Sequence, residues 1–155
     1  MELISRKELK KVGIYCINHN IRKAMRVVTA LYDEILRPAG IRSTQFSILA
    51  TIYYKGSINL TRLANLLVID RTTLIRNVEV LERDELVEFL LEQKGNTRKV
   101  KITHKGIDKI QNAFPLWETA QESIVHELGE EQWKDLIRSL SLLVKVAGKH
   151  TNDQS

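Results

Sequence analysis

The sequence has little cysteine, little proline and no long apolar run. Its 155 residues include one cysteine, two prolines and seven glycines. A single thiol excludes an internal disulfide framework and a cysteine-based zinc cage, because each requires at least two thiols. No stretch approaches the roughly 18 apolar residues of a membrane span, and charges occupy the place of a secretory apolar segment near the start. We therefore expect a cytoplasmic protein with no membrane segment.

The overall composition is that of a folded protein with an excess of positive charge. Hydrophobic residues make up 43% and charged residues 28%, which excludes the disordered and low-complexity classes. The length predicts a single domain over 1–155. The formal net charge of +5 and the pI near 9.4 favour a polyanionic partner such as nucleic acid.

Apolar side chains at both ends of the chain follow helical spacing. Near the N-terminus they are separated alternately by three and four residues, at Ile14, Ile17, Ile21, Ala24, Val28, Leu31 and Ile35. This spacing predicts one long helix that stops at residues 37–40. Two later series have the same spacing: Ile107, Ile110, Phe114, Trp117, Gln121, Ile124 and Leu128, with one polar break at Gln121, and then Trp133, Leu136, Leu140, Leu143 and Ala147.

These flanking series predict helical regions over 6–37 and 106–149 that pack helix against helix, within one chain or between two. Pro115 predicts a kink or a helix start. The two tryptophans, Trp117 and Trp133, occupy heptad positions, and we expect them in a dimer core rather than in a ligand cage. Residues 149–155 are expected to be a frayed tail.

The middle of the chain has a different pattern. A short apolar helix is expected over 44–54, capped by Ser43 or Thr44. Two further helices follow, over 60–67 with Asn59 as cap and over 71–83 with Asp70 as cap. Alternating apolar residues on both sides of a turn at 93–97 then predict a β-hairpin. This order indicates a mainly α (α+β) protein with a winged helix-turn-helix lobe over 43–105.

The second helix of this motif has side chains suited to reading DNA. Arginine pairs bidentately with guanine, and threonine reaches base edges or a thymine methyl group. Leu74, Val78 and Leu81 form the opposite, core-facing stripe, and the acidic residues from Glu79 onward are expected to lie away from phosphate. A solvated helix face is the alternative, which the tandem-helix context disfavours. The candidate residues of this recognition helix are Arg71, Thr72, Thr73, Arg76 and Asn77.

The hairpin carries cations and no carboxylate between Lys94 and Lys105. Such a wing suits phosphate or a minor groove, although lysines on edge strands also serve to prevent pairing between sheets. The candidate wing residues are Lys94, Asn96, Arg98, Lys99 and Lys101. We assign contacts with the DNA backbone to Thr44, Thr61 and Arg62.

The ordered pattern resembles the MarR family of winged-helix transcriptional regulators over nearly the whole chain. The residues that carry the resemblance lie at 36–41, 44–49, 60–64, 70–74, 81–83, 86–87 and 102–106. The resemblance implies a homodimer with interlocked terminal helices that binds a pseudo-palindromic operator in double-stranded DNA, usually as a repressor. One departure concerns the wing, where the Asp-x-Arg triplet common in the family is replaced by Lys94-Gly95-Asn96. Arg98 is the residue available as a substitute, at a shifted position.

The resemblance also implies control by a signal. Many relatives sense a small phenolic or lipophilic acid, and one branch senses peroxide through a cysteine in the first helix. Cys16 lies in that region with His19, Arg22 and Lys23 nearby, and cations lower the pKa of a thiol. A redox sensor and a small buried apolar side chain are both consistent with this position.

Other classes of function are less favoured. The histidines are scattered without metal-ligand spacing, so no metal site and no cofactor are expected. A Cys16 and His19 pair lacks oxyanion donors and a third orienting residue, so we do not expect an enzyme. The main alternative to a DNA-binding regulator is a winged-helix adaptor that binds protein.

Overall fold

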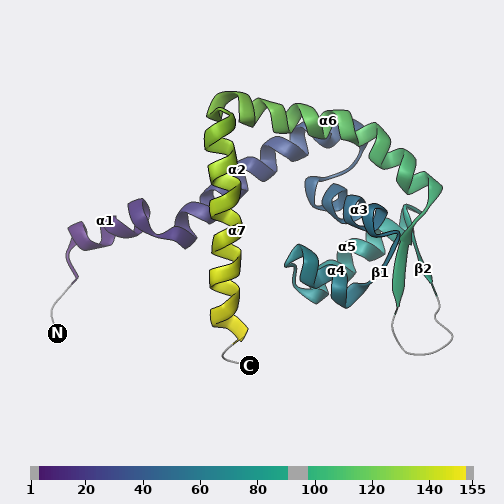
Figure 1. Ribbon diagram of the computed structural model, residues 1–155, viewed down its shortest axis with the longest axis horizontal. Helices are drawn as coiled ribbons and strands as arrows, with labels where there is room; N and C mark the ends of the chain where they lie inside the picture. The colour runs from purple at the N-terminus through teal and green to yellow at the C-terminus, as the bar shows by residue number, and fades with distance from the viewer. Residues whose placement is uncertain (1–3, 91–97, 153–155) are drawn as a thin grey trace. The chain divides into compact units, whose positions relative to one another are not determined.

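The computed structural model describes residues 4–90 and 98–152. Helices predominate in it, and one small antiparallel sheet accompanies them (Figure 1), so the predicted fold class is confirmed. The chain forms two compact units, Met1–Trp117 and Glu118–Ser155. In chain order the elements are α1 (Arg6–Tyr15), α2 (Ile17–Leu36), η1 (Arg37–Ala39), α3 (Ser43–Lys55), β1 (Ser57–Asn59), α4 (Leu60–Leu67), α5 (Arg71–Arg83), β2 (Val87–Leu90), β3 (Lys99–Ile102), α6 (His104–Leu128) and α7 (Glu130–Asn152).

The N-terminal helical region is two helices, so the prediction of one uninterrupted helix through Ile14 and Ile35 is wrong. Cys16 has an extended backbone (φ −69°, ψ 114°) and separates α1 from α2. The Asn20 side chain stabilises the break, because its amide donates hydrogen bonds to the carbonyls of Ile14 (3.2 Å) and Cys16 (3.0 Å). The Ile14 carbonyl lies in the last turn of α1, where helical partners are lacking. The Cys16 carbonyl also accepts the backbone amide of Asn20 (3.1 Å) as α2 begins.

The predicted stop at residues 37–40 is confirmed, and a side chain from α2 then fixes the start of α3. Gly40 has a left-handed backbone (φ 65°) that ends η1. The residue at the α3 N-cap position is Arg42, so neither Ser43 nor Thr44 is the cap. Asp33 instead accepts hydrogen bonds from the Ser43 amide (2.7 Å) and hydroxyl (2.6 Å). This contact joins α2 to the first turn of α3.

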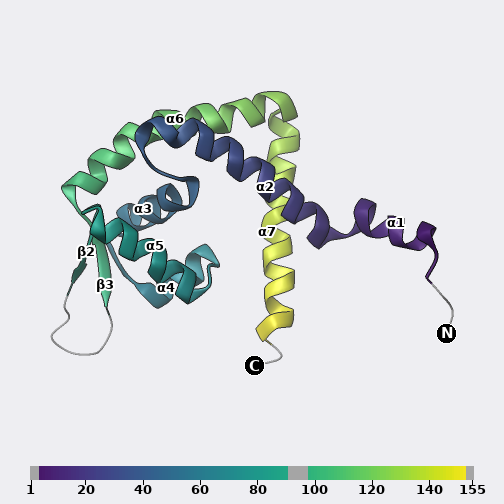
Figure 2. The ribbon, with the colours of Figure 1, turned by 180° about the vertical axis from the view of Figure 1, so that it is seen from behind.

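The tandem helices form as predicted, each with its predicted cap. The Asn59 side chain accepts a hydrogen bond from the Arg62 amide (2.7 Å) at the start of α4. The Asp70 side chain accepts one from the Thr73 amide (3.0 Å) at the start of α5. Both caps satisfy amides that have no carbonyl partner in a first helical turn. Figures 1 and 2 show α3, α4 and α5 gathered beside the sheet.

The predicted hairpin is present and has a third strand. Strands β2 and β3 pair antiparallel, with Phe89 opposite Val100. Strand β1, which the sequence pattern does not reveal, pairs with the other edge of β3 and gives the order β1-β3-β2. The core lies between this sheet and helices α3 to α5. Its fully buried side chains include Ile48, Leu49, Ile52, Leu63, Leu74, Val78, Leu81 and Val100.

Helix α6 runs without interruption through Pro115, so no helix starts there. Trp117 stacks on Phe114 (5.6 Å between ring centroids) and on Phe46 of α3 (6.1 Å), beside the core of its own chain. The ring is only half-buried by this aromatic cluster, so its expected place in a dimer core stays a prediction.

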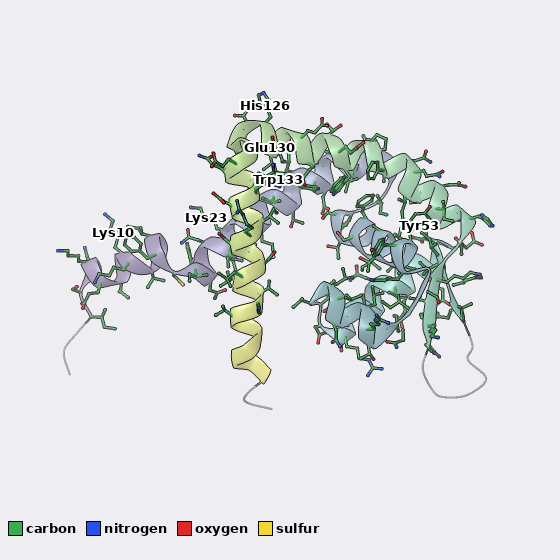
Figure 3. All side chains as sticks on the ribbon, in the orientation of Figure 1. Lys10, Lys23, Tyr53, His126, Glu130 and Trp133 are labelled. Atoms are coloured by element: carbon green, nitrogen blue, oxygen red, sulfur yellow. The ribbon has the colours of Figure 1, made fainter. Side chains whose placement is uncertain are left out.

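Helix α7 belongs to the second unit and continues to Asn152, so residues 149–152 are not the frayed tail that was expected. Trp133 lies near the start of this helix (Figure 3). Leu136 and Leu140 of the predicted stripe are exposed. In the described ranges, no helix is both long and apolar enough to cross a membrane.

Candidate nucleic-acid interface

Helix α5 has a buried face and an exposed face, as predicted. Leu74, Val78 and Leu81 have no solvent-exposed surface, and they anchor the helix to the core. The side chains at the start of the other face are exposed: Arg71, Thr72, Thr73 and Arg76. The helix therefore presents two guanidinium groups and two hydroxyl groups to solvent near its N-terminus, where N–H groups and the helix dipole also favour an anion.

Asp70 orders the first turn of this helix. The hydrogen bond from the Thr73 amide holds the pKa of the Asp70 carboxyl below its usual range. Asn77, also a candidate for base contact, is half-buried and donates from its side-chain amide to the Thr73 carbonyl (2.9 Å). One Asn77 donor is thus engaged within the helix, which leaves Arg71, Thr72, Thr73 and Arg76 as the more available readers.

The three candidates for backbone contact lie in the first turns of two helices. Thr44 is exposed at the start of α3, and Thr61 and Arg62 are exposed at the start of α4. Helix α4 packs against α5, so Thr61 and Arg62 lie on the helix next to the recognition helix. This is the position from which the first helix of such a motif crosses the DNA backbone.

The cations of the wing differ in their partners. Lys94 and Asn96 lie outside the described residues. Lys101 pairs with Glu88 of β2 (2.9 Å), and Lys105 pairs with Glu85 (2.7 Å). The hydrogen bond and the charge of Lys105 also lower the pKa of Glu85. Lys99 is half-buried at the start of β3. These ion pairs reduce the number of wing cations that are ready to meet phosphate.

Arg98 is held differently, on the face of an aromatic ring. Its guanidinium carbon lies 5.7 Å from the centroid of the Phe89 ring, within the range of a cation–π contact. Sequence reasoning missed Phe89 as part of the site. The available signal was the strand register, since Phe89 lies opposite Val100, and Arg98 is then its diagonal neighbour on the same face.

A recess of about 320 Å³ lies between the recognition helix and the wing. Its lining includes Arg71 and Ile75 of α5, Thr61 of α4, and the pair Phe89 and Arg98. Glu79 and Glu82 line the same recess, so these two acidic side chains lie near the cations. Their expected position away from phosphate stays a prediction. Arg71 and Arg98 therefore share the recess with two carboxylates, whose negative charge restricts where a phosphate group is able to approach.

Two other predicted features concern metals and Cys16. Cys16 is a half-buried free thiol at the break between α1 and α2. Within residues 4–90 and 98–152, the His, Cys, Asp and Glu side chains do not gather in groups of three or more that could hold a metal ion.

The capped tandem helices, the exposed arginines and threonines and the wing together define a winged helix-turn-helix transcriptional regulator. The chain belongs to the MarR family, whose family model matches residues 41–100. Similarity to the M. tuberculosis transcriptional regulator MosR, in a structure in complex with DNA, extends over most of the chain. The identity is 34% and the TM-score 0.80, with 86% of this chain and 97% of the MosR chain covered.

Two more distant structures share the fold. A mutant MarR from E. coli complexed with operator DNA is 21% identical, with a TM-score of 0.78 and coverage of 86% of this chain and 97% of that chain. NadR in complex with 4-hydroxyphenylacetate is 23% identical, with a TM-score of 0.71 and coverage of 94% and 99%. No match was found among curated protein sequences. Family and fold are those of transcriptional regulators.

Proposed function

We propose that the chain forms a homodimer that binds a pseudo-palindromic operator in double-stranded DNA and represses nearby genes. The observation that carries the proposal is the exposed cluster of Arg71, Thr72, Thr73 and Arg76 on a capped recognition helix. The similar M. tuberculosis MosR in a DNA complex supports it. Lobe 43–105 would contact DNA, and regions 6–37 and 106–149 would form the dimer.

The dimer is supported by apolar surface that a single chain leaves uncovered. On α2 the predicted stripe is exposed at Ile17 (62%), Ile21 (37%), Val28 (42%) and Leu31 (37%). A continuous apolar stripe on a helix is normally buried against a partner. A second copy of the chain is the natural partner, because two copies would present two recognition helices to two half-sites.

The test is a fluorescence-anisotropy titration against the DNA immediately upstream of the chain's own gene, at two salt concentrations, with a random duplex as control. Selective binding that falls steeply with salt is expected. Arg76→Ala should weaken operator binding by about 1–3 kcal/mol, the range of one good base contact. Arg71→Ala should weaken binding to both duplexes and flatten the salt dependence, as loss of a phosphate contact does.

The matched control is Arg83→Ala, which removes the same charge from the other end of α5. Arg83 lies 3.7 Å from Asp84 and roughly 18 Å along the helix from Arg71. Its loss should leave operator affinity nearly unchanged. Operator affinity equal to the parent's in both Arg71→Ala and Arg76→Ala would show that α5 does not bind in the DNA groove. Failure to bind any duplex would favour the protein-binding adaptor.

Release of the DNA by a small phenolic or lipophilic acid, or by oxidation of Cys16, belongs to the same proposal. The 4-hydroxyphenylacetate bound by NadR supports the first signal, and the position of Cys16 at a helix break supports the second. The same titration with added phenolic acids or peroxide separates them, because only a response to peroxide should disappear in Cys16→Ser.

A further inference from the structure

Among the cations in the described part of the wing, Arg98 has contacts that leave its hydrogen-bond donors available. Among residues 4–90 and 98–152, no carboxylate lies within ion-pair distance of its guanidinium group, whereas Lys101 and Lys105 each bind one. Its contact is with the face of the Phe89 ring. A carboxylate partner occupies N–H donors, but an aromatic face holds the guanidinium plane and leaves the N–H groups at its edge free to bind.

The Phe89 ring is itself fixed in place. It is half-buried, lies on β2, and packs against the core cluster of the winged lobe. Phe89 lies opposite Val100, a fully buried residue of β3. Arg98 immediately precedes β3, so the ring lies beside the residue that it contacts. An anchored ring restricts the rotamers of the arginine above it, and this restriction reduces the entropy that binding costs.

Arg98 lies across a shared recess from the recognition helix α5. Arg98 and Phe89 line it from the wing, and Arg71 lines it from the first turn of α5. Two arginines from separate elements thus border one recess at the surface predicted to meet DNA. Arginine suits this position because its planar donor fork matches the oxygens of a phosphate or of guanine.

We propose that Phe89 is a positioning residue that presents the Arg98 guanidinium to DNA beside Arg71. Phe89 does not contact the DNA in this arrangement; it acts through the arginine stacked on it. The proposal rests on the proposed function and deepens it, because it identifies the side chain that enables this wing to bind without a carboxylate to hold its arginine.

The test is a double-mutant cycle on the full chain, with operator affinity measured by anisotropy for Phe89→Leu, Arg98→Ala and the double variant. Arg98→Ala should lower operator affinity about tenfold, within the range of one bidentate contact. Phe89→Leu keeps apolar volume but removes the aromatic face, and should lower affinity about threefold to fivefold. In the Arg98→Ala background the same Phe89 change should have no further effect, since its partner is already absent.

Two further variants separate positioning from packing. Phe89→Tyr keeps the ring and should retain the parent's affinity. Arg98→Lys keeps the charge but loses the planar group, and should make affinity nearly insensitive to Phe89→Leu. Urea unfolding of each variant establishes that the lobe is folded. An equal loss from Phe89→Leu in both Arg98 backgrounds, or no loss at all, would overturn the proposal. A parent chain that does not distinguish the upstream DNA from random duplex would instead remove the proposed function itself.

Discussion

At the scale of single residues, Gly106 has the tightest surroundings of the described glycines. It lies in the first turn of α6, where a Cβ atom would stand 2.1 Å from the Leu86 carbonyl oxygen and 2.6 Å from the Ile102 side chain. A backbone oxygen cannot rotate away, so overpacking here must move β2 or α6. We expect Gly106→Ala to lower the free energy of unfolding by about 3 kcal/mol, near the upper end for overpacked cores, as measured by urea denaturation.

Gly13 is the matched control for this substitution. It lies inside α1, and apart from its chain neighbours and the backbone of its own helix, no described atom would stand within 4 Å of its Cβ. Gly13→Ala should therefore leave stability unchanged or raise it by up to about 1 kcal/mol, because alanine favours a helix over glycine. Equal unfolding curves for Gly106→Ala and the parent would show that the junction between β2 and α6 has room for a methyl group.

At the scale of elements, the start of α5 depends on Asp70. Its carboxylate accepts a hydrogen bond from the Thr73 amide. Asp70→Ala should therefore lower the melting temperature by a few degrees. It should also weaken operator binding, because the first turn of α5 carries Arg71 and Thr72. The lowered pKa of the Asp70 carboxyl determines how its contribution to stability depends on pH. The contribution of the carboxylate is present above the unfolded-state pKa and is lost as the pH falls through the folded-state pKa.

Thermal melts of parent and Asp70→Ala at pH 7 and pH 3 check this prediction. The difference in melting temperature should be largest at pH 7 and should shrink as the pH falls below the unfolded-state pKa of Asp70 towards its lowered folded-state pKa, where the carboxyl becomes protonated. Asp70→Asn is the control, because it keeps an acceptor oxygen without the charge. The difference in melting temperature between Asp70→Asn and Asp70→Ala should be nearly the same at the two pH values. A difference between parent and Asp70→Ala that is the same at both pH values would contradict the assignment.

The elements that the sequence predicted well are those specified by local contacts. Asn59 and Asp70 each cap a helix through an amide three residues later, so a short window of sequence contains both partners. The cap of α3 was mispredicted because its acceptor, Asp33, lies ten residues before Ser43 on another helix. Strand β1 has three residues, and its partner Lys101 follows Ser57 by more than forty positions, so no local period reveals it.

The same distinction applies to the candidate interface. The exposed and buried faces of α5 follow from helical periodicity, which separates Arg76 from Leu74 without knowledge of the fold. The contact between Phe89 and Arg98 depends on the register of two strands, and charge counting alone gave Lys101 the same weight as Arg98. The strand register distinguishes them, because it places Lys101 beside Glu88 and Arg98 beside Phe89.

At the scale of the whole molecule, two recognition helices are needed to read two half-sites, so operator affinity should depend on the apolar stripe of α2. Val28 is 42% exposed in that stripe. Val28→Glu places a charge in the proposed dimer contact, where burying it without a partner is costly. We expect the variant to sediment as a monomer and to lose about 100-fold or more in operator affinity, the usual range for loss of two-site binding.

Ala30→Glu is the matched control, because it adds the same charge to the exposed side of α2, about 140° around the helix from the centre of the stripe. It should sediment as the parent does and keep operator affinity within a few fold, and both variants should show the parent's helical circular dichroism. Random duplex supplies the second comparison: a monomeric Val28→Glu chain should retain much of its weak, salt-dependent binding, since each lobe keeps Arg71 and Arg98. A dimeric Val28→Glu chain with full operator affinity would place the subunit contact elsewhere.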